Sequence, residues 1–72
     1  MSMNVLYEIN LPDGQCWTTT PIYSQAVEAA KEKAKKDGVP IEVAKHNLTT
    51  GQVTRNIYHP DGIVEKLWLS KR

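Results

Sequence analysis

The sequence predicts an α+β domain in the order ββαβββ, a mainly antiparallel sheet of about five strands with one helix packed on one face. Pro-Asp-Gly occurs twice, at residues 12–14 and 60–62, each time between runs rich in strand-forming residues. Such a motif between two strands is typical of a hairpin turn. One stretch of helix-forming residues separates the two turns. The 72 residues have room for a single small domain, so no boundary is expected within residues 1–72.

The first Pro-Asp-Gly motif predicts a hairpin between strands at residues 4–11 and 15–20. Proline presets φ for the first turn position, and glycine accepts the left-handed position that follows. The pairing that closes this turn places Ile9 opposite Trp17, and opposed residues share a sheet face. One side would then carry Val5, Tyr7, Ile9 and Trp17, and the other Leu6, Glu8, Asn10 and Thr18.

Residues 25–37 predict the helix, with Ser24 as its N-cap and Gly38 as its left-handed C-cap. Small apolar residues recur along it at three- and four-residue spacing: Ala26, Val27, Ala30 and Ala34. A stripe this narrow lets the helix approach the sheet closely, so the strands must supply the large core side chains. The pattern from Ser24 to Val53 resembles that of many short bacterial and phage domains, and it implies no residue roles.

Two further hairpins are expected after the helix, from strands at residues 41–46 and 52–58 and from a last strand beyond the second Pro-Asp-Gly turn. Pairing His46 with Gln52 sets the register of the first of these hairpins, and the turn sets that of the second. Both registers assign Ile57 to the same sheet face, which makes them mutually consistent.

The two faces of the predicted sheet differ in composition. The helix-covered face would hold Val5, Tyr7, Ile9, Trp17, Ile41, Val43, Val53, Ile57, Ile63, Leu67 and Leu69. The opposite face would hold Glu42, Ala44, His46, Thr54, Asn56, Tyr58, Val64, Lys66 and Trp68. The same registers place Arg55 on the covered face, diagonal to Glu65, where a buried charge needs that partner or a path to solvent.

Composition and charge narrow the classes of partner and compartment. The net charge of +1, from nine Lys and Arg against eight Asp and Glu, is too balanced for a protein that mainly binds phosphate backbones. No apolar run approaches the roughly 18 residues of a membrane span. Residues 1–10 lack the basic and apolar regions of a signal peptide. With a single cysteine, Cys16, and therefore no internal disulfide, we expect a cytoplasmic protein with no membrane partner.

Catalytic and metal-binding chemistry have little support in the sequence. Cys16, His46 and His59 are the only thiol and imidazoles, and the fold alone would have to assemble a nucleophile pair from them. A structural zinc site needs four Cys or His ligands at short spacings, and no loop resembles a calcium or phosphate site. One helix over one sheet also leaves little volume for a small molecule. We therefore expect no catalytic, metal or cofactor-binding residues and no small-molecule substrate.

The helix-free face suggests the function. Tyr58 and Trp68 would be exposed there beside Lys66, His46 and Asn56, as a candidate interaction surface. The leading hypothesis is a non-enzymatic binding or regulatory module that uses this face, or a sheet edge, to bind a protein partner or to form a homodimer. The alternative is a nucleic-acid-binding accessory protein that stacks bases on the two aromatic rings. A third interpretation is that the rings only shield the sheet backbone.

Overall fold

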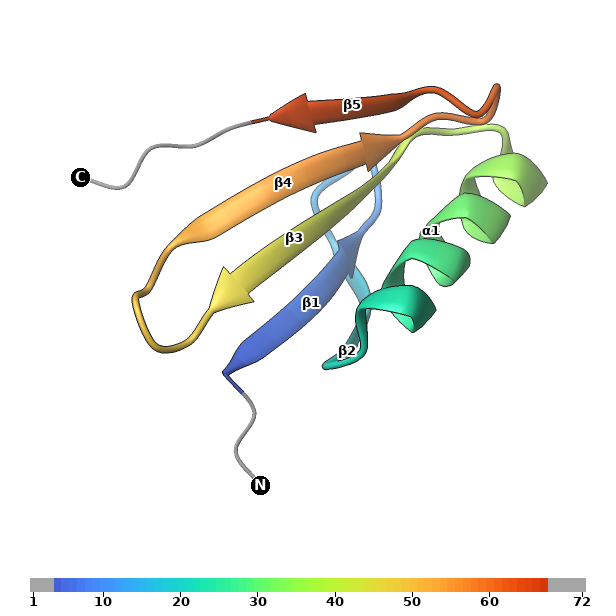
Figure 1. Ribbon diagram of the computed structural model, residues 1–72. Helices are drawn as coiled ribbons and strands as arrows, with labels where there is room; N and C mark the ends of the chain where they lie inside the picture. Colours follow the sequence, from blue (N-terminus) through green and yellow to red (C-terminus); the bar gives the residue numbers. More distant parts are fainter. Residues whose placement is uncertain (1–3, 68–72) are drawn as a thin grey trace.

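A computed structural model describes residues 4–67 and confirms the predicted fold class. One helix packs on a five-stranded antiparallel sheet in the order β2-β1-β3-β4-β5 (Figure 1). The elements are β1 (Val5–Asn10), β2 (Cys16–Thr20), α1 (Tyr23–Asp37), β3 (Ile41–Asn47), β4 (Val53–Tyr58) and β5 (Val64–Leu67). Figure 1 shows α1 against one side of the sheet, with no second layer of described residues on the other side.

The two Pro-Asp-Gly turns form the same hydrogen-bond pattern. In the first turn the Leu11 N–H donates to the Gln15 carbonyl at 2.8 Å, and the Asp13 carboxylate accepts from the Gln15 N–H at 3.0 Å. The equivalent residues of the second turn are His59, Ile63 and Asp61, at 2.9 and 3.0 Å. Gly14 and Gly62 close the turns with φ of 93° and 95°, which glycine adopts without strain.

The helix begins one residue before its predicted N-cap. Its first residue is Tyr23, so Ser24 lies inside the first turn rather than capping it. Ile22 occupies the N-cap position without a side-chain cap, and the Thr20 hydroxyl accepts the Ile22 N–H at 3.1 Å. The predicted C-cap is confirmed, because Gly38 is left-handed with φ of 68° and donates its N–H to a carbonyl of the last turn at 2.8 Å.

The core lies between α1 and the central strands. Its buried residues are Tyr7, Ile9, Ala26, Ala30, Ala34, Ile41, Val43 and Tyr58. The three alanines follow one another at four-residue spacing and are 0 % exposed, so α1 contacts the sheet through small side chains alone on this line. Ile9 and Ile41 are the largest fully buried side chains. As predicted, the strands rather than the helix supply the bulk of the core.

A bulge shifts the register of the first hairpin. Ile9 pairs with Thr18 rather than with Trp17, because the register shifts by one residue between Ile9 and Asn10. Thr18 therefore shares the helix-covered side with Ile9, contrary to the prediction. Trp17 still lies on the helix side, because Lys33 Nζ lies 4.7 Å from the centroid of its ring.

The predicted register between β3 and β4 is wrong by one residue. His46 pairs with Val53 rather than with Gln52, and Ile41 pairs with Tyr58. Because successive side chains of a strand point to opposite faces, a slip of one residue moves every side chain of β4 to the other face. The predicted register between β4 and β5 is confirmed, so the side chains of β5 also lie on the face opposite to the predicted one.

The β3–β4 loop explains the slip. The Asn47 N–H donates to the Gln52 carbonyl at 2.8 Å, so the closing pair lies one residue later in β3 than predicted. The Asn47 side-chain oxygen accepts from the N–H groups of Thr49 and Thr50 at 3.0 and 3.1 Å. Gly51, with φ of 78°, donates its N–H to the Asn47 carbonyl at 2.7 Å. Asparagine is favoured at the start of a turn for this bonding, and β3 therefore extends to Asn47, one residue beyond the predicted end of the strand.

The slip exchanges the predicted contents of the two faces along β4 and β5. Val53, Arg55, Ile57 and Leu67 were expected beneath the helix and lie on the helix-free face. Ile63 was also expected in the core and is 60 % exposed in the turn before β5. Leu69, the last residue assigned to the covered face, lies outside the described residues.

Candidate interaction surface

The five residues of the predicted interaction surface do not lie together. His46 is on the helix-free face, whereas Tyr58 is 5 % exposed and belongs to the core. Asn56 pairs with Val43, which is buried under the helix, and Lys66 pairs with Asn56, so both lie on the covered side. Trp68 lies outside the described residues. As a single surface the predicted set is therefore wrong, because it depended on the incorrect β3–β4 register.

Tyr58 belongs to a cluster of tyrosines on the helix side. Burial raises the pKa of Tyr58, and Tyr23 raises it further through its charge and a side-chain hydrogen bond, while a hydrogen bond with Asn56 acts in the opposite direction. The rings of Tyr7 and Tyr23 lie 5.6 Å apart between centroids, tilted by 59°. Burial also raises the pKa of Tyr7. Tyr58 and Tyr7 therefore stabilise the core as neutral rings.

The helix-free face, called the open face below, combines aliphatic and charged side chains. It is formed by alternate residues of β1, β3, β4 and β5. Those residues are Leu6, Glu8, Asn10, Glu42, Ala44, His46, Val53, Arg55, Ile57, Glu65 and Leu67. The residues of β1 and β3 were predicted on this face, and those of β4 and β5 were missed.

Three polar contacts cross between strands on the open face. His46 Nε2 on β3 lies 3.2 Å from Glu8 Oε1 on β1. The Asn10 amide donates to one Glu42 oxygen at 2.9 Å, and Arg55 Nη1 lies 3.8 Å from the other. The Glu42 carboxylate is thus contacted by both neighbouring strands, which restrains charged side chains in defined positions.

Ala44 marks the centre of the open face. It is 0 % exposed although no helix covers it. Its cross-strand neighbours are Glu8 and Arg55, whose longer side chains close over it. The Arg55 side chain is 41 % exposed, while its Nε is buried with no hydrogen-bond partner among the described residues. Arg55 therefore packs its inner part against the sheet and keeps its guanidinium partly open to solvent.

Half-buried aliphatic side chains surround this charged centre. Leu6 and Val53 lie on either side of His46, Ile57 lies on β4, and Leu67 lies on β5. Ile57 also lines an open hollow of about 380 Å³ at one end of the sheet. The other lining residues are Leu11, Pro12, Gly14, Pro40, Glu42 and Arg55. The open face thus offers apolar contact area around fixed charges.

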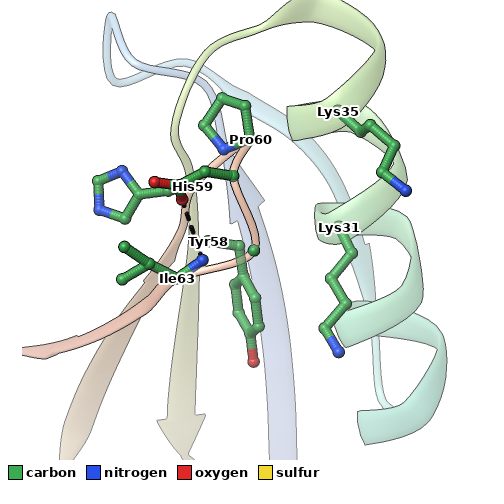
Figure 2. Close-up of a pocket in the computed structure, with 8 residues that line it drawn as sticks. Lys31, Lys35, Tyr58, His59, Pro60 and Ile63 are labelled. Atoms are coloured by element: carbon green, nitrogen blue, oxygen red, sulfur yellow. Dashed lines mark hydrogen bonds between the residues drawn. The ribbon is translucent and has the colours of Figure 1, made fainter.

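A second hollow, of about 280 Å³, lies on the helix side between α1 and the β4–β5 turn. Figure 2 shows Lys31 and Lys35 along the flank of the helix and the ring of Tyr58 beside them. The His59 imidazole points away from both lysines (Figure 2), and its Nε2 lies 3.1 Å from a Glu65 oxygen. Lys31, Lys35 and Asp61 are all exposed, so the rim of this hollow carries charges of both signs.

The thiol and the two imidazoles are held by separate contacts. Cys16 is exposed on β2, with its Sγ 3.7 Å from the Thr18 carbonyl oxygen. His46 and His59 each lie beside a different glutamate. Across residues 4–67, no three His, Cys, Asp or Glu side chains are grouped so that they could hold a metal ion.

Two further findings bear on the class of protein. Within the described part of the chain, no helix combines the length and apolar character required to cross a membrane. Comparison of the chain with protein-family models, with curated proteins and with solved structures finds no match.

Proposed function

We propose that this protein is a non-enzymatic binding module that docks a protein surface on its open face. The observation that carries the proposal is the composition of this face, where aliphatic side chains surround a restrained charged centre. Leu6, Val53, Ile57 and Leu67 are half-buried on the side opposite α1. Aliphatic side chains provide area to desolvate, and restrained charges provide orientation and specificity.

Nucleic-acid binding has less support than protein binding. Tyr58, one of the two expected stacking residues, is 5 % exposed under the helix, and the other, Trp68, lies outside the described residues. The open face carries the carboxylates of Glu8, Glu42 and Glu65 against the guanidinium of Arg55. The excess of carboxylates repels a phosphate backbone, whereas a protein surface that carries both signs of charge can place opposite charges against these side chains.

The open face is also a better docking site than the sheet edges. The edge strand β2 is mostly exposed, but the bulge near Cys16 interrupts its ladder. Bulges of this kind protect edges from pairing with another strand. The other edge strand, β5, has four residues, which gives a short template for strand addition.

Photocrosslinking in the native cells tests the proposal. A photoreactive residue replaces Val53 or Leu67 on the open face, and a matched control replaces Glu32, which is exposed on α1. We expect protein adducts from positions 53 and 67 but not from position 32. Arg55→Glu should reduce the adducts without loss of the circular dichroism spectrum of the fold. Equal adduct yields at all three positions, or none from the open face, would contradict the proposal.

A further inference from the structure

We infer that the partner on the open face is a second copy of this chain, packed face to face so that Glu8 of each copy meets Arg55 of the other. The inference rests on the proposed function and identifies its partner. It is carried by the central row of the open face, where Glu8 and Arg55 lie on either side of Ala44 and become complementary under one symmetry operation.

The central row of the open face carries the complementary charges. Across the strands this row runs from Glu8 on β1 through Ala44 on β3 to Arg55 on β4. A two-fold axis that lies along β3, between two stacked sheets, exchanges the positions of β1 and β4. Glu8 of one copy then faces Arg55 of its partner, and the symmetry forms this pair twice. Ala44 lies on the axis, where its small side chain allows close approach.

The next row supports the same axis. Leu6 on β1 and Val53 on β4 flank His46 on β3. The rotation therefore places Leu6 of one copy over Val53 of its partner, which pairs aliphatic side chains across the interface. An axis along the strands also keeps the strand directions of both sheets aligned, as in packed sheets whose directions differ by about 30°.

The remaining row is the least favourable. It brings the Glu42 carboxylates of the two copies toward the axis. Each Glu42 already accepts a hydrogen bond from Asn10 at 2.9 Å and lies 3.8 Å from Arg55, and both contacts reduce the repulsion.

The alternative axis, across the strands, gives a worse match. It would keep β1 over β1 and β4 over β4, so that Glu8 would face Glu8 and Arg55 would face Arg55. Like charges opposed across an interface are strongly disfavoured. The charge pattern therefore selects the axis along β3.

The size of the face fits a modest dimer. Strands about 4.8 Å apart and about six residues long, at about 3.3 Å per residue, give a five-stranded sheet about 500 Å² of area per copy. Two copies would bury about 1,000 Å² in total, near the lower bound for a specific interface. We therefore expect a dimer whose population depends on protein concentration.

Charge reversal tests the inference by sedimentation equilibrium. The wild-type protein should dimerise, and Glu8→Arg or Arg55→Glu alone should weaken dimerisation at least about tenfold, because each opposes like charges twice. The double variant Glu8→Arg/Arg55→Glu restores opposite charges and should recover most of the affinity. Lys35→Glu, at an exposed position on α1, is the matched control and should change nothing. Circular dichroism verifies the fold of each variant.

Mixed samples provide a second measurement that needs no reversed charge. In a Cys16→Ser background, a spin label at position 53 of unlabelled protein should broaden the Leu6 amide signal of ¹⁵N-labelled protein. Stronger broadening of Leu6 than of Ile57, with no broadening of the α1 amides, supports the axis along β3, because the axis across the strands would place position 53 over Ile57 instead. Broadening of the α1 amides instead would overturn it.

The outcomes separate this inference from the proposed function. A wild-type protein that stays monomeric at millimolar concentration overturns the second copy as the partner, as does a dimer that both single reversals leave intact. A double variant as weak as the single variants overturns the Glu8–Arg55 pairing. If the monomeric protein still crosslinks another protein through position 53 or 67, the proposed function survives without the inference. If the open face forms no crosslinks at all, both fail.

Discussion

The two faces of the sheet are stabilised in different ways. On the helix-covered face the strands bury large side chains against a line of alanines, and Ile9 and Ile41 are 0 % exposed. On the open face, pairs such as Glu8 with His46 and Glu42 with Arg55 connect side chains of adjacent strands. The side chains of the covered face are therefore stabilised by packing against α1, and those of the open face by contacts with neighbouring strands of the same sheet.

This difference divides stability from binding. Side chains that are already removed from water contribute hydrophobic stabilisation in the monomer. The aliphatic side chains of the open face are only half-buried, so their remaining apolar area can be removed from water when a partner binds. We therefore expect core substitutions to act mainly on folding and open-face substitutions mainly on association, and the following substitutions test that division.

The largest expected effect compares two isoleucines on opposite faces. Ile41→Ala removes a fully buried side chain and should lower the free energy of unfolding by about 2–5 kcal/mol. Ile57→Ala removes a half-buried side chain on the open face and should cost about 1 kcal/mol, because less apolar area returns to water. Urea melts monitored by circular dichroism measure both.

The predicted register placed Ile57 on the helix-covered face, so the same experiment tests the corrected register. Thr54→Ala on the covered side serves as a mild control for substitution within β4. An Ile57→Ala loss as large as that of Ile41→Ala would contradict the division between the faces.

A second test adds volume to the covered face. Ala30 is 0 % exposed in the line of alanines where α1 meets the sheet. Ala30→Leu should destabilise the protein by about 1–3 kcal/mol, because the helix must move away or the new side chain must adopt a strained rotamer. Glu32→Leu, at an exposed position of the same helix, should change stability by less than about 0.5 kcal/mol. Thermal melts that rank the two substitutions in reverse order would contradict close packing of α1.

Local signals predicted the elements well. The Pro-Asp-Gly turns, the run of alanines and the left-handed Gly38 each act over a few residues, and each feature is present in the structure. The N-terminus of the helix was predicted two residues late because Ser24, a favourable N-cap residue, lies inside the first turn. Errors of this size leave the fold unchanged.

The candidate site required long-range information that local signals do not contain. The covered face was predicted from apolar character, because Val53, Ile57 and Leu67 are more apolar than their neighbours Thr54, Asn56 and Lys66. That criterion failed because the open face is apolar too. The agreement between two registers at Ile57 was no independent check, since the β4–β5 register was right and carried the β3–β4 error along. The one useful local signal was Asn47, whose side chain sets the loop.

A smaller effect, confined to alkaline pH, comes from the tyrosines of the covered face. Burial raises the pKa of Tyr58 in the folded protein above its ordinary value of 10.0. The folded state therefore holds the phenol proton more tightly than the unfolded chain does. The resulting stability is fully present below pH 10 and is lost as the pH rises through the raised pKa. Tyr58→Phe should make the decline of stability with alkaline pH less steep.

Urea melts at a series of pH values from about 8 upward measure that decline. Tyr7→Phe is a useful companion, because burial raises the pKa of Tyr7 as well. An unchanged alkaline slope in Tyr58→Phe would mean that its hydroxyl is solvated in the folded state, which would conflict with its place in the core.

The smallest expected effect compares polar contacts on the open face and on the surface of α1. Glu42→Ala removes the acceptor of the Asn10 amide, and Asn10 is 9 % exposed. A buried amide without its acceptor should cost about 1 kcal/mol. The contact of Glu42 with Arg55 adds little, because at 3.8 Å and 41 % exposure of Arg55 solvent screens the charges.

Asp37→Ala is the matched comparison on the helix. It breaks the surface ion pair with Lys33, whose atoms lie 2.9 Å apart four residues along the helix. Such pairs contribute about 0.3–0.5 kcal/mol, and a carboxylate in the last helical turn also opposes the helix dipole, so the net loss should be close to zero. Asp37→Ala should therefore cost less stability than Glu42→Ala, although the Lys33–Asp37 distance is shorter than the Arg55–Glu42 distance. The reason is that Glu42→Ala leaves the buried Asn10 amide without its acceptor. Urea melts at low and high salt separate the two contributions: salt should leave the Glu42→Ala loss nearly unchanged. A larger loss from Asp37→Ala would show that the contacts of the open face do not stabilise the monomer.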